Sequence, residues 1–123
     1  MDQAPDLHAF IQEYTDAVYH SRDPEAVARF IADPCIRHEH GHQVVMSLAE
    51  NKARVAAFLA QARNLRFENA AALAEGDLYA SAYEFSFIAG GQETARSGIE
   101  IFRVRDGKIV ETWNAAVGEG PWG

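Results

Sequence analysis

Apolar residues recur at helical spacing over the first half of the chain. From Asp6 onward they lie three or four residues apart with polar residues between them, which predicts an amphipathic helix. Asp23 followed by Pro24 begins a short second helix, and Asp33 before Pro34 ends it, because a residue before proline disfavours the helical conformation. A capping box at Ser47 opens a third helix. The apolar positions of the three helices are Leu7, Phe10, Ile11, Tyr14 and Val18; Ala26, Val27, Phe30 and Ile31; and Val55, Phe58, Leu59 and Ala62.

The apolar period changes to two after residue 64. Strand-forming runs cover residues 65–75, 78–89, 94–105 and 109–117, and turn residues separate them. The strongest turn signal is Asp106-Gly107 within residues 98–114, because this dipeptide favours a two-residue hairpin turn. Residues 35–43 are short, polar and rich in histidine, and we expect a brief strand that runs into a loop.

Helices followed by consecutive hairpins indicate the α+β class, with the helices packed on one face of an antiparallel meander. Large apolar residues occur on both faces of the predicted sheet. Tyr83, Phe85 and Phe87 share one face, and Ile99 and Ile101 lie on the face opposite Glu100. A sheet that is apolar on both faces needs two covers. The helices supply one, and we expect a second copy of the chain, in a homodimer, to supply the other.

Composition limits the class of protein and its partners. A chain of 123 residues that is 48% hydrophobic is long enough to form a single domain, residues 1–123, with a core that needs no disulfide or metal. The net charge of −7 argues against nucleic acid or an anionic membrane as a partner. Cys35 is the single cysteine, which indicates a reducing compartment. With no leader pattern and no apolar run of membrane-spanning length, we expect a soluble cytoplasmic protein.

Glu100 is the most unusual residue of the predicted sheet. It lies between Ile99 and Ile101, and it shares a strand face with Phe102 and Val104. A carboxylate in this position either reaches the rim of the sheet or faces an enclosed cavity, where burial raises its pKa and makes it a candidate acid or base. The structural alternative is a buried carboxyl satisfied by Arg96, Tyr14 or water.

His38, His40 and His42 alternate along the chain. On an extended strand they would share one face, and their imidazoles could chelate zinc or copper. Gly41 favours a turn that scatters them, so the preferred interpretation is a set of loop histidines at a pocket mouth, with no metal and no cofactor. His38 alone is a candidate proton carrier, because imidazole titrates near neutral pH.

Three features resemble the nuclear transport factor 2-like superfamily: the histidine-bearing segment ending at Gly41, AxxAAFL at residues 53–59, and IEIFRVRDGKIVETWN at residues 99–114. The chain looks most like the branch of SnoaL-like polyketide cyclases and ketosteroid isomerases. This resemblance implies a strongly curved, mostly antiparallel sheet wrapped around three helices, with a conical pocket and pairing through the convex sheet face. It does not fix the function, because the same cone serves cyclases, isomerases, epoxide hydrolases, dehydratases and binding modules.

The resemblance also implies roles for individual residues. His38 occupies the base position, Glu100 the inward-facing acid position and Tyr14 the first-helix tyrosine position, with Asn114 as a further catalytic candidate. The implied substrate-binding positions are Phe30, Phe58, Tyr83, Phe85, Phe87, Arg96, Gly98 and Thr112.

Two departures from the family patterns are informative. Isomerases of this branch carry aspartate where this chain has His38, and cyclase-like relatives often have histidine there. The related epoxide hydrolases need an arginine two residues before an aspartate on the penultimate strand, whereas this chain has Gly98 two residues before Glu100. Epoxide hydrolysis is therefore disfavoured.

Two functions fit these residues. The first is a cofactor-independent isomerase or cyclase, in which His38 moves a proton next to a carbonyl of an apolar, ring-bearing substrate while Glu100 or Asn114 donates a hydrogen bond to the enolate. The second is a binding module that holds an apolar small molecule without turnover. A subunit-interaction domain with a vestigial pocket is a third, less favoured reading.

Overall fold

The helices of the protein lie mainly in the first half of the chain. The structure, a computed structural model, describes residues 6–39 and 41–123. Helix α1, Leu7–Tyr14, continues without a break as the π-helical turn η1, Thr15–His20, and the 3-10 helix η2 covers Pro24–Arg29. Helix α2, Leu48–Gln61, begins with the predicted capping box of Ser47 and Glu50. No helix among the described residues is long and apolar enough to cross a membrane.

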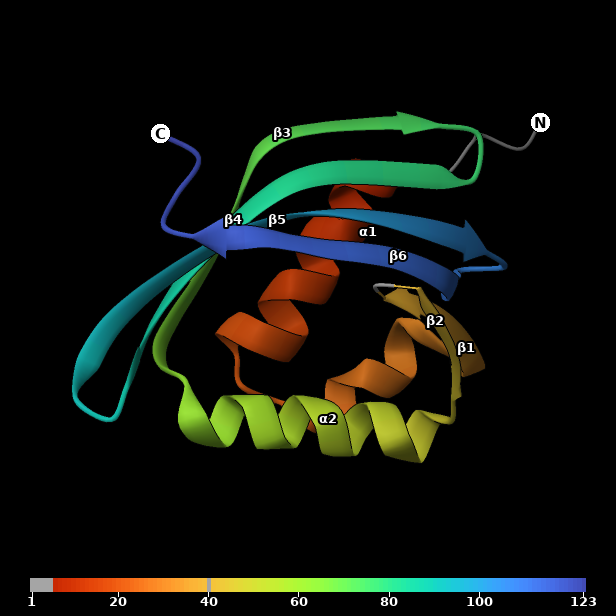
Figure 1. Ribbon diagram of the computed structural model, residues 1–123. Helices are drawn as coiled ribbons and strands as arrows, with labels where there is room; N and C mark the ends of the chain where they lie inside the picture. Colours follow the sequence, from red (N-terminus) through yellow and green to blue (C-terminus); the bar gives the residue numbers. More distant parts are fainter. Residues whose placement is uncertain (1–5, 40) are drawn as a thin grey trace.

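Six strands form one curved sheet (Figure 1). They are β1 Ile31–Glu39, β2 His42–Met46, β3 Arg63–Glu75, β4 Leu78–Ala89, β5 Gln92–Arg105 and β6 Lys108–Glu119. Their order is β2-β1-β6-β5-β4-β3, and every pair is antiparallel except β1 and β6, which run parallel. The predicted meander from β3 to β6 and the α+β class are confirmed.

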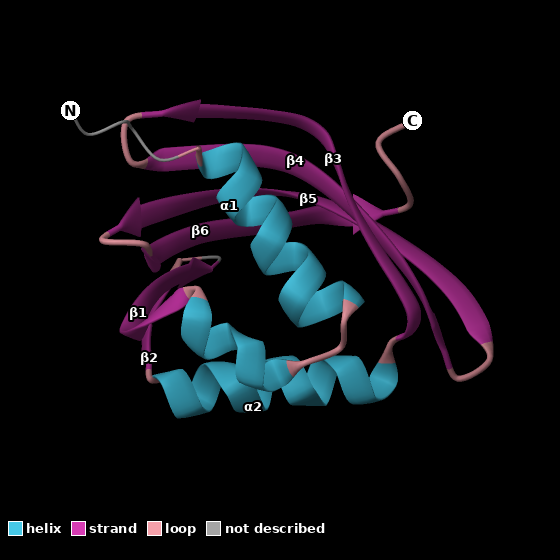
Figure 2. Cartoon of the chain, turned by 180° about the vertical axis from the view of Figure 1, so that it is seen from behind, coloured by secondary structure: helices cyan, strands magenta, loops and turns pink. Residues whose placement is uncertain are grey.

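The helices lie against the concave side of the sheet (Figure 2). Both views show α1 crossing that side, while the β4–β5 hairpin end curls toward one end of α2. The predicted apolar face of α1 is buried, and Val18 and Val27 have no exposed surface. These helical residues and the inward residues of β4, β5 and β6, among them Tyr79, Phe102 and Ile109, form one core.

The region between the first and third helices differs from the prediction. The second helix ends at Arg29, and Asp33 and Pro34 lie inside β1 instead of stopping a helix. The backbone N–H of Ile109 donates to the carbonyl of Phe30 over 2.7 Å, a contact between distant segments that no local pattern reveals. The loop predicted after β1 contains a second strand, β2, and Gly41 between the two strands has a positive φ of 82°.

The terminal hairpin fixes which residues face the helices. Asp106 and Gly107 both have positive φ, 52° and 75°, as the predicted two-residue turn requires. Across the β5–β6 pair Glu100 lies opposite Asn114, and across the β4–β5 pair it lies opposite Ser81. A register irregularity of the β5–β6 pair between Arg103 and Val104 thus brings the Glu100 and Asn114 side chains together on the concave face.

Candidate functional site

A cavity of about 210 Å³ lies between the helices and the concave face of the sheet. Aromatic rings form much of its wall, and a small number of polar groups interrupt them. Its lining residues are Ile11, Gln12, Tyr14, Thr15, Tyr19, Ile31, Cys35, Arg37, Arg54, Phe58, Phe67, Glu68, Asn69, Ser81, Tyr83, Phe85, Glu100, Phe102, Ile109, Thr112 and Asn114. An apolar pocket with a few converging polar groups is the usual form of a small-molecule site.

Glu100 occupies the sheet side of this cavity, so the enclosed alternative applies and the rim alternative does not. Its side chain is half-buried, and its remaining exposed surface faces the cavity. Burial raises the pKa of the Glu100 carboxyl, while a hydrogen bond from Asn114 and the charges of Arg37 and Arg54 oppose the rise. Desolvation is the larger effect because few water molecules can solvate a carboxylate enclosed in this way.

Asn114 and Tyr83 extend the polar group around Glu100. The Tyr83 hydroxyl donates to the Asn114 Oδ1 atom over 3.4 Å, and Asn114 in turn hydrogen bonds to Glu100. Burial raises the pKa of the Tyr83 hydroxyl, so this group is a proton donor at neutral pH. The chain of contacts holds the Glu100 side chain in one orientation.

Gly98 makes room for the Tyr83 ring. A Cβ atom built at residue 98 would lie 2.7 Å from the Tyr83 Cζ atom and 2.9 Å from the carbonyl oxygen of Ala115. The family resemblance implies that Gly98 contacts substrate, but Gly98 is not among the lining residues; it lies beneath the Tyr83 ring. Its role here is to let Tyr83 reach Asn114.

We expect Gly98→Ala to displace the Tyr83 ring and to destabilise the fold by about 1–3 kcal/mol, the usual cost of overpacking. Urea denaturation measures this loss. The matched control is Gly118→Ala on the neighbouring strand β6, where an added Cβ meets nothing within 4 Å, and which should change stability by less than about 0.5 kcal/mol. Equal stability of the two variants would contradict the packing role of Gly98.

Two arginines that the sequence analysis did not select line the cavity. Arg37 comes from β1, and its Nε donates to the Glu39 Oε1 atom over 3.0 Å. Arg54 comes from α2 and contacts the Asn51 Oδ1 atom over 3.3 and 3.4 Å. Arg54 is four residues before Phe58, which places both on one flank of the helix. This four-residue spacing from Phe58 is the sequence pattern that could have indicated Arg54 as a cavity residue.

Two tyrosines approach each other on the helix side of the cavity. The hydroxyls of Tyr14 and Tyr19 are 3.4 Å apart, and their rings meet edge to face. Burial and the neighbouring Tyr19 raise the pKa of the Tyr14 hydroxyl well above its ordinary value, so it stays protonated. Tyr14 lines the cavity, as the family resemblance implies, and Tyr19, which no sequence pattern indicated, lines it too.

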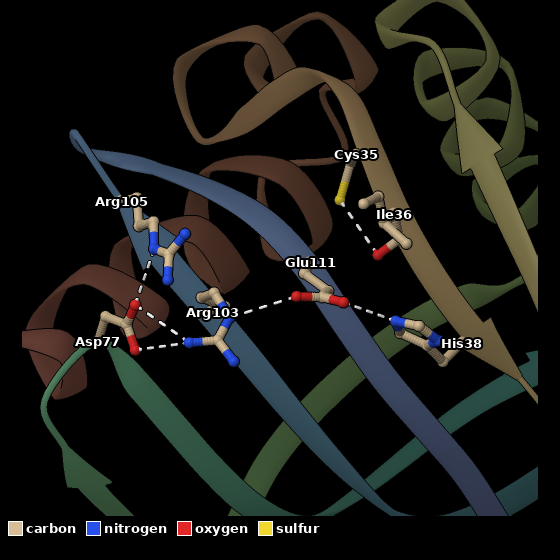
Figure 3. A network of polar contacts seen from close by, with 7 residues as sticks. All are labelled: Cys35, Ile36, His38, Asp77, Arg103, Arg105 and Glu111. Atoms are coloured by element: carbon tan, nitrogen blue, oxygen red, sulfur yellow. Dashed lines mark hydrogen bonds and ion pairs between the residues drawn. The ribbon is translucent and has the colours of Figure 1, made fainter.

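His38 does not lie in this cavity, so the expectation that it faces Glu100 is wrong. Its Nε2 atom is 2.7 Å from the Glu111 Oε2 atom, and its ring stacks on Trp113 at 5.1 Å. Figure 3 shows that Glu111 also contacts Arg103, and that Arg103 in turn contacts Asp77. This network lies on the outer face, where His38, Trp113, Ile99 and Ile101 line a separate shallow groove. The pocket-facing neighbour on β1 is Arg37, one residue earlier.

Three further predicted positions also lie outside the lining. Phe30 is a buried core residue, Phe87 stacks behind Phe85 at 5.8 Å, and Arg96 contacts the Glu119 carboxylate at 3.4 Å near the end of the sheet. Phe58, Tyr83, Phe85, Glu100, Thr112 and Asn114 do line the cavity.

The structure describes two of the three alternating histidines, His38 on β1 and His42 on β2. His42 lies on β2, opposite Glu39 of β1, and His40 is outside the described residues. Among residues 6–39 and 41–123 no group of three or more His, Cys, Asp or Glu side chains is arranged to hold a metal ion.

Comparison with known proteins gives a consistent family and fold. The SnoaL-like domain family model matches residues 11–112. No protein of curated function matches the chain. A proposed polyketide cyclase from Acidithiobacillus ferrooxidans superposes with a TM-score of 0.80 at 17% identity, covering 94% of this chain and 91% of that one. A SnoaL-like polyketide cyclase from Agrobacterium tumefaciens gives 0.78 at 15% identity, covering 93% of each chain.

A third similar structure is named for a different reaction, epoxide hydrolysis. An LEH-like epoxide hydrolase from Mycobacterium tuberculosis gives a TM-score of 0.72 at 12% identity, covering 89% of this chain and 80% of that one. At these identities the superpositions show the fold alone, because one fold carries many activities.

Proposed function

The chain belongs to the SnoaL-like domain family, and from that premise we propose that it is a cofactor-independent isomerase or cyclase in which Glu100 moves a proton next to a carbonyl. The cavity supports a small, ring-bearing substrate, because 210 Å³ is below the roughly 300–1,000 Å³ of sites for drug-sized ligands. Its aromatic walls favour an apolar ring.

One observation carries the proposal: Glu100 is a carboxyl inside an apolar cavity, and burial raises its pKa. A general base works best when its pKa is near the operating pH, because it must accept a proton and also release it. A carboxylate becomes a stronger base as its pKa rises, provided that it is still ionised at the operating pH. Burial shifts the pKa of Glu100 in the direction that this role needs.

The reaction needs a second group that holds the carbonyl oxygen as negative charge develops on it. Thr112 is on the cavity wall, 3% exposed, and its Oγ1 atom has no hydrogen-bond partner among the described residues. It is two residues before Asn114 on β6 and opposite Phe102 of β5, so it lies on the same sheet face as Glu100. The Tyr14 hydroxyl already contacts Tyr19, which makes Thr112 the better donor.

The proposed reaction needs no other reactant, because the proton that Glu100 removes from the substrate is returned to it. The Glu100 carboxylate takes a proton from the carbon next to the carbonyl, and the carbonyl oxygen becomes an enolate oxygen that accepts a hydrogen bond from Thr112. Return of the proton from Glu100 to a different carbon moves a double bond. Attack of the enolate carbon on a second carbonyl of the substrate closes a ring, and Glu100 then protonates the new alkoxide.

Deuterium exchange tests this function directly. Incubation in deuterated buffer with a β,γ-unsaturated cyclohexenone and a cyclic β-keto ester should replace the hydrogen next to the carbonyl faster than buffer alone, as followed by proton NMR. Saturable exchange in either ketone would support the enzyme. Ketones that bind, as shown by ligand line broadening, but exchange no faster than in buffer would overturn it in favour of a binding module.

Homodimer formation through the outer sheet face stays a prediction. Ile99 on that face is 40% exposed, and Trp113 and Ile101 lie beside it in the shallow groove. Exposed apolar surface of this kind is typical of an interface. The site proposed above lies wholly on the concave face of one chain.

A further inference from the structure

Arg54 presents a positive charge to the cavity. Among the residues that the structure describes, no Asp or Glu oxygen lies within 4 Å of its guanidinium, whereas Arg37, Arg96 and Arg103 each have such a partner. Its neighbours are the amide oxygen of Asn51 and the Tyr19 hydroxyl. Arginine stays charged in proteins, and a half-buried charge without a counter-charge is costly.

Glu100 shares the cavity but does not contact the Arg54 guanidinium. Among the described residues the two side chains form no ion pair, and their charges act on each other only at a distance. Burial opposes the charge on Arg54, but the Tyr19 and Tyr14 hydroxyls outweigh this effect and raise its pKa. Arg54 therefore remains a cation that has no acidic side chain in direct contact among the described residues.

The surroundings of Arg54 specify the shape of a matching ligand. Phe58 follows Arg54 by one helical turn, and its ring meets the rings of Phe85 at 6.0 Å and Phe87 at 6.1 Å. Phe67 stacks on Phe85 at 4.9 Å. A ligand ring against these aromatic side chains would place a substituent beside the guanidinium.

We propose that Arg54 binds a carboxylate group of the ligand, so that the pocket accepts small ring-bearing carboxylic acids in preference to their neutral analogues. This proposal rests on the function proposed above only in treating the bound acid as a substrate. Guanidinium and carboxylate match in geometry and form charge-assisted hydrogen bonds. The protein as a whole carries a charge of −7, so it repels an anion unless a local cation such as Arg54 receives it.

Calorimetry with matched probes tests the preference. The probes are benzoate and naphthoate with their primary amides, which keep ring and shape but lose the charge. We expect the intact protein to bind at least one acid about 10- to 100-fold more tightly than its amide, the range of a charge-assisted hydrogen bond in a poorly solvated site. Arg54→Met should remove this preference, and Arg54→Lys should retain part of it.

Lys52→Met is the control on the same helix. Lys52 is not among the residues that line the cavity, and it pairs with Glu25 at 2.8 Å, so its replacement removes one positive charge without changing the pocket wall. We expect it to keep the full acid preference. A loss of preference equal to that of Arg54→Met would show a general charge effect and overturn the proposal.

Two other results would overturn the inference: equal binding of acid and amide by the unaltered protein, or a preference that survives Arg54→Met. The first needs no variant, so it decides the question even if a variant fails to fold. Acid preference without ketone exchange would support this inference while refuting the proposed enzyme. Ketone exchange without acid preference would do the reverse.

Discussion

Glu100→Gln should slow deuterium exchange into a bound ketone by about 10²- to 10⁴-fold, the usual contribution of a positioned acid or base. Glutamine keeps the size of the side chain and can still hydrogen bond to Asn114, but its amide cannot accept the substrate proton. The rate constant under saturating ketone, measured by proton NMR, is the appropriate readout. Ligand affinity should change far less than the rate, because the group acts in the transition state.

Glu93→Gln on the same strand is the matched control. Glu93 is exposed near the start of β5 and is not among the residues that line the cavity, so the same chemical change there should leave the exchange rate unaltered. If Glu100→Gln also exchanges at the unaltered rate, Glu100 is not the proton carrier, and the proposed mechanism is wrong.

The stability of Glu100→Gln separates lost chemistry from lost folding. Because burial raises the pKa of Glu100, the folded protein keeps this proton at pH values where the unfolded chain, with a pKa of about 4.3, has released it. The unaltered protein therefore loses stability as pH rises from about 4.3 to the raised pKa, and then levels off. Glu100→Gln lacks this loss, so urea denaturation should show its relative stability rising across that window. If the stabilities of the two proteins changed with pH in parallel, the raised pKa of Glu100 would be contradicted.

Phe102→Ala should cost about 3–5 kcal/mol of unfolding free energy, because it removes a buried aromatic ring and leaves a cavity. Phe102 is 6% exposed, and its ring centroid lies 6.3 Å from that of Tyr14 and 6.1 Å from that of Tyr79. It joins the helical core to the sheet. Urea denaturation followed by circular dichroism measures the loss.

Ile101→Ala gives the comparison for the opposite side of the same strand. Ile101 is half-buried and lines the shallow groove of the outer face, so we expect a distinctly smaller loss than for Phe102→Ala. If the two substitutions lower the unfolding free energy equally, the side chains of β5 on the concave face are not the ones that pack in the core. The result also checks the strand parity on which the position of Glu100 depends.

The sequence predicts the second half of the fold well because the information there is local. The Asp106-Gly107 turn sets the first pairs of β5 with β6, Arg105 with Lys108 and Val104 with Ile109. A register irregularity between Arg103 and Val104 then shifts the pairing by one residue and places Glu100 opposite Asn114, a shift that no turn signal predicts. The first half depends on distant contacts. The Phe30 carbonyl, just after the second helix, accepts a hydrogen bond from the distant Ile109, and β2 pairs with β1 alone.

The error at His38 has the same cause. β1 is a mixed strand with a register irregularity against β6 between Ile31 and Ile36, and its sequence shows no clean alternation. A shift of one residue moves every side chain to the other face, which exchanges His38 for Arg37 in the pocket. Arg54 escaped notice because a single arginine on a helix is usually solvated, and only the cavity beside it shows otherwise.

The parallel pairing of β1 with β6 also determines when the pocket can form during synthesis of the chain. The wall joins Cys35 and Arg37, translated early, to Thr112 and Asn114, translated near the end. A growing polypeptide on the ribosome can therefore build its helices and first hairpins, but it cannot enclose a ligand until the last strand emerges. Native contacts so far apart in the chain slow folding, and until β6 arrives one edge of β1 stays open to other chains.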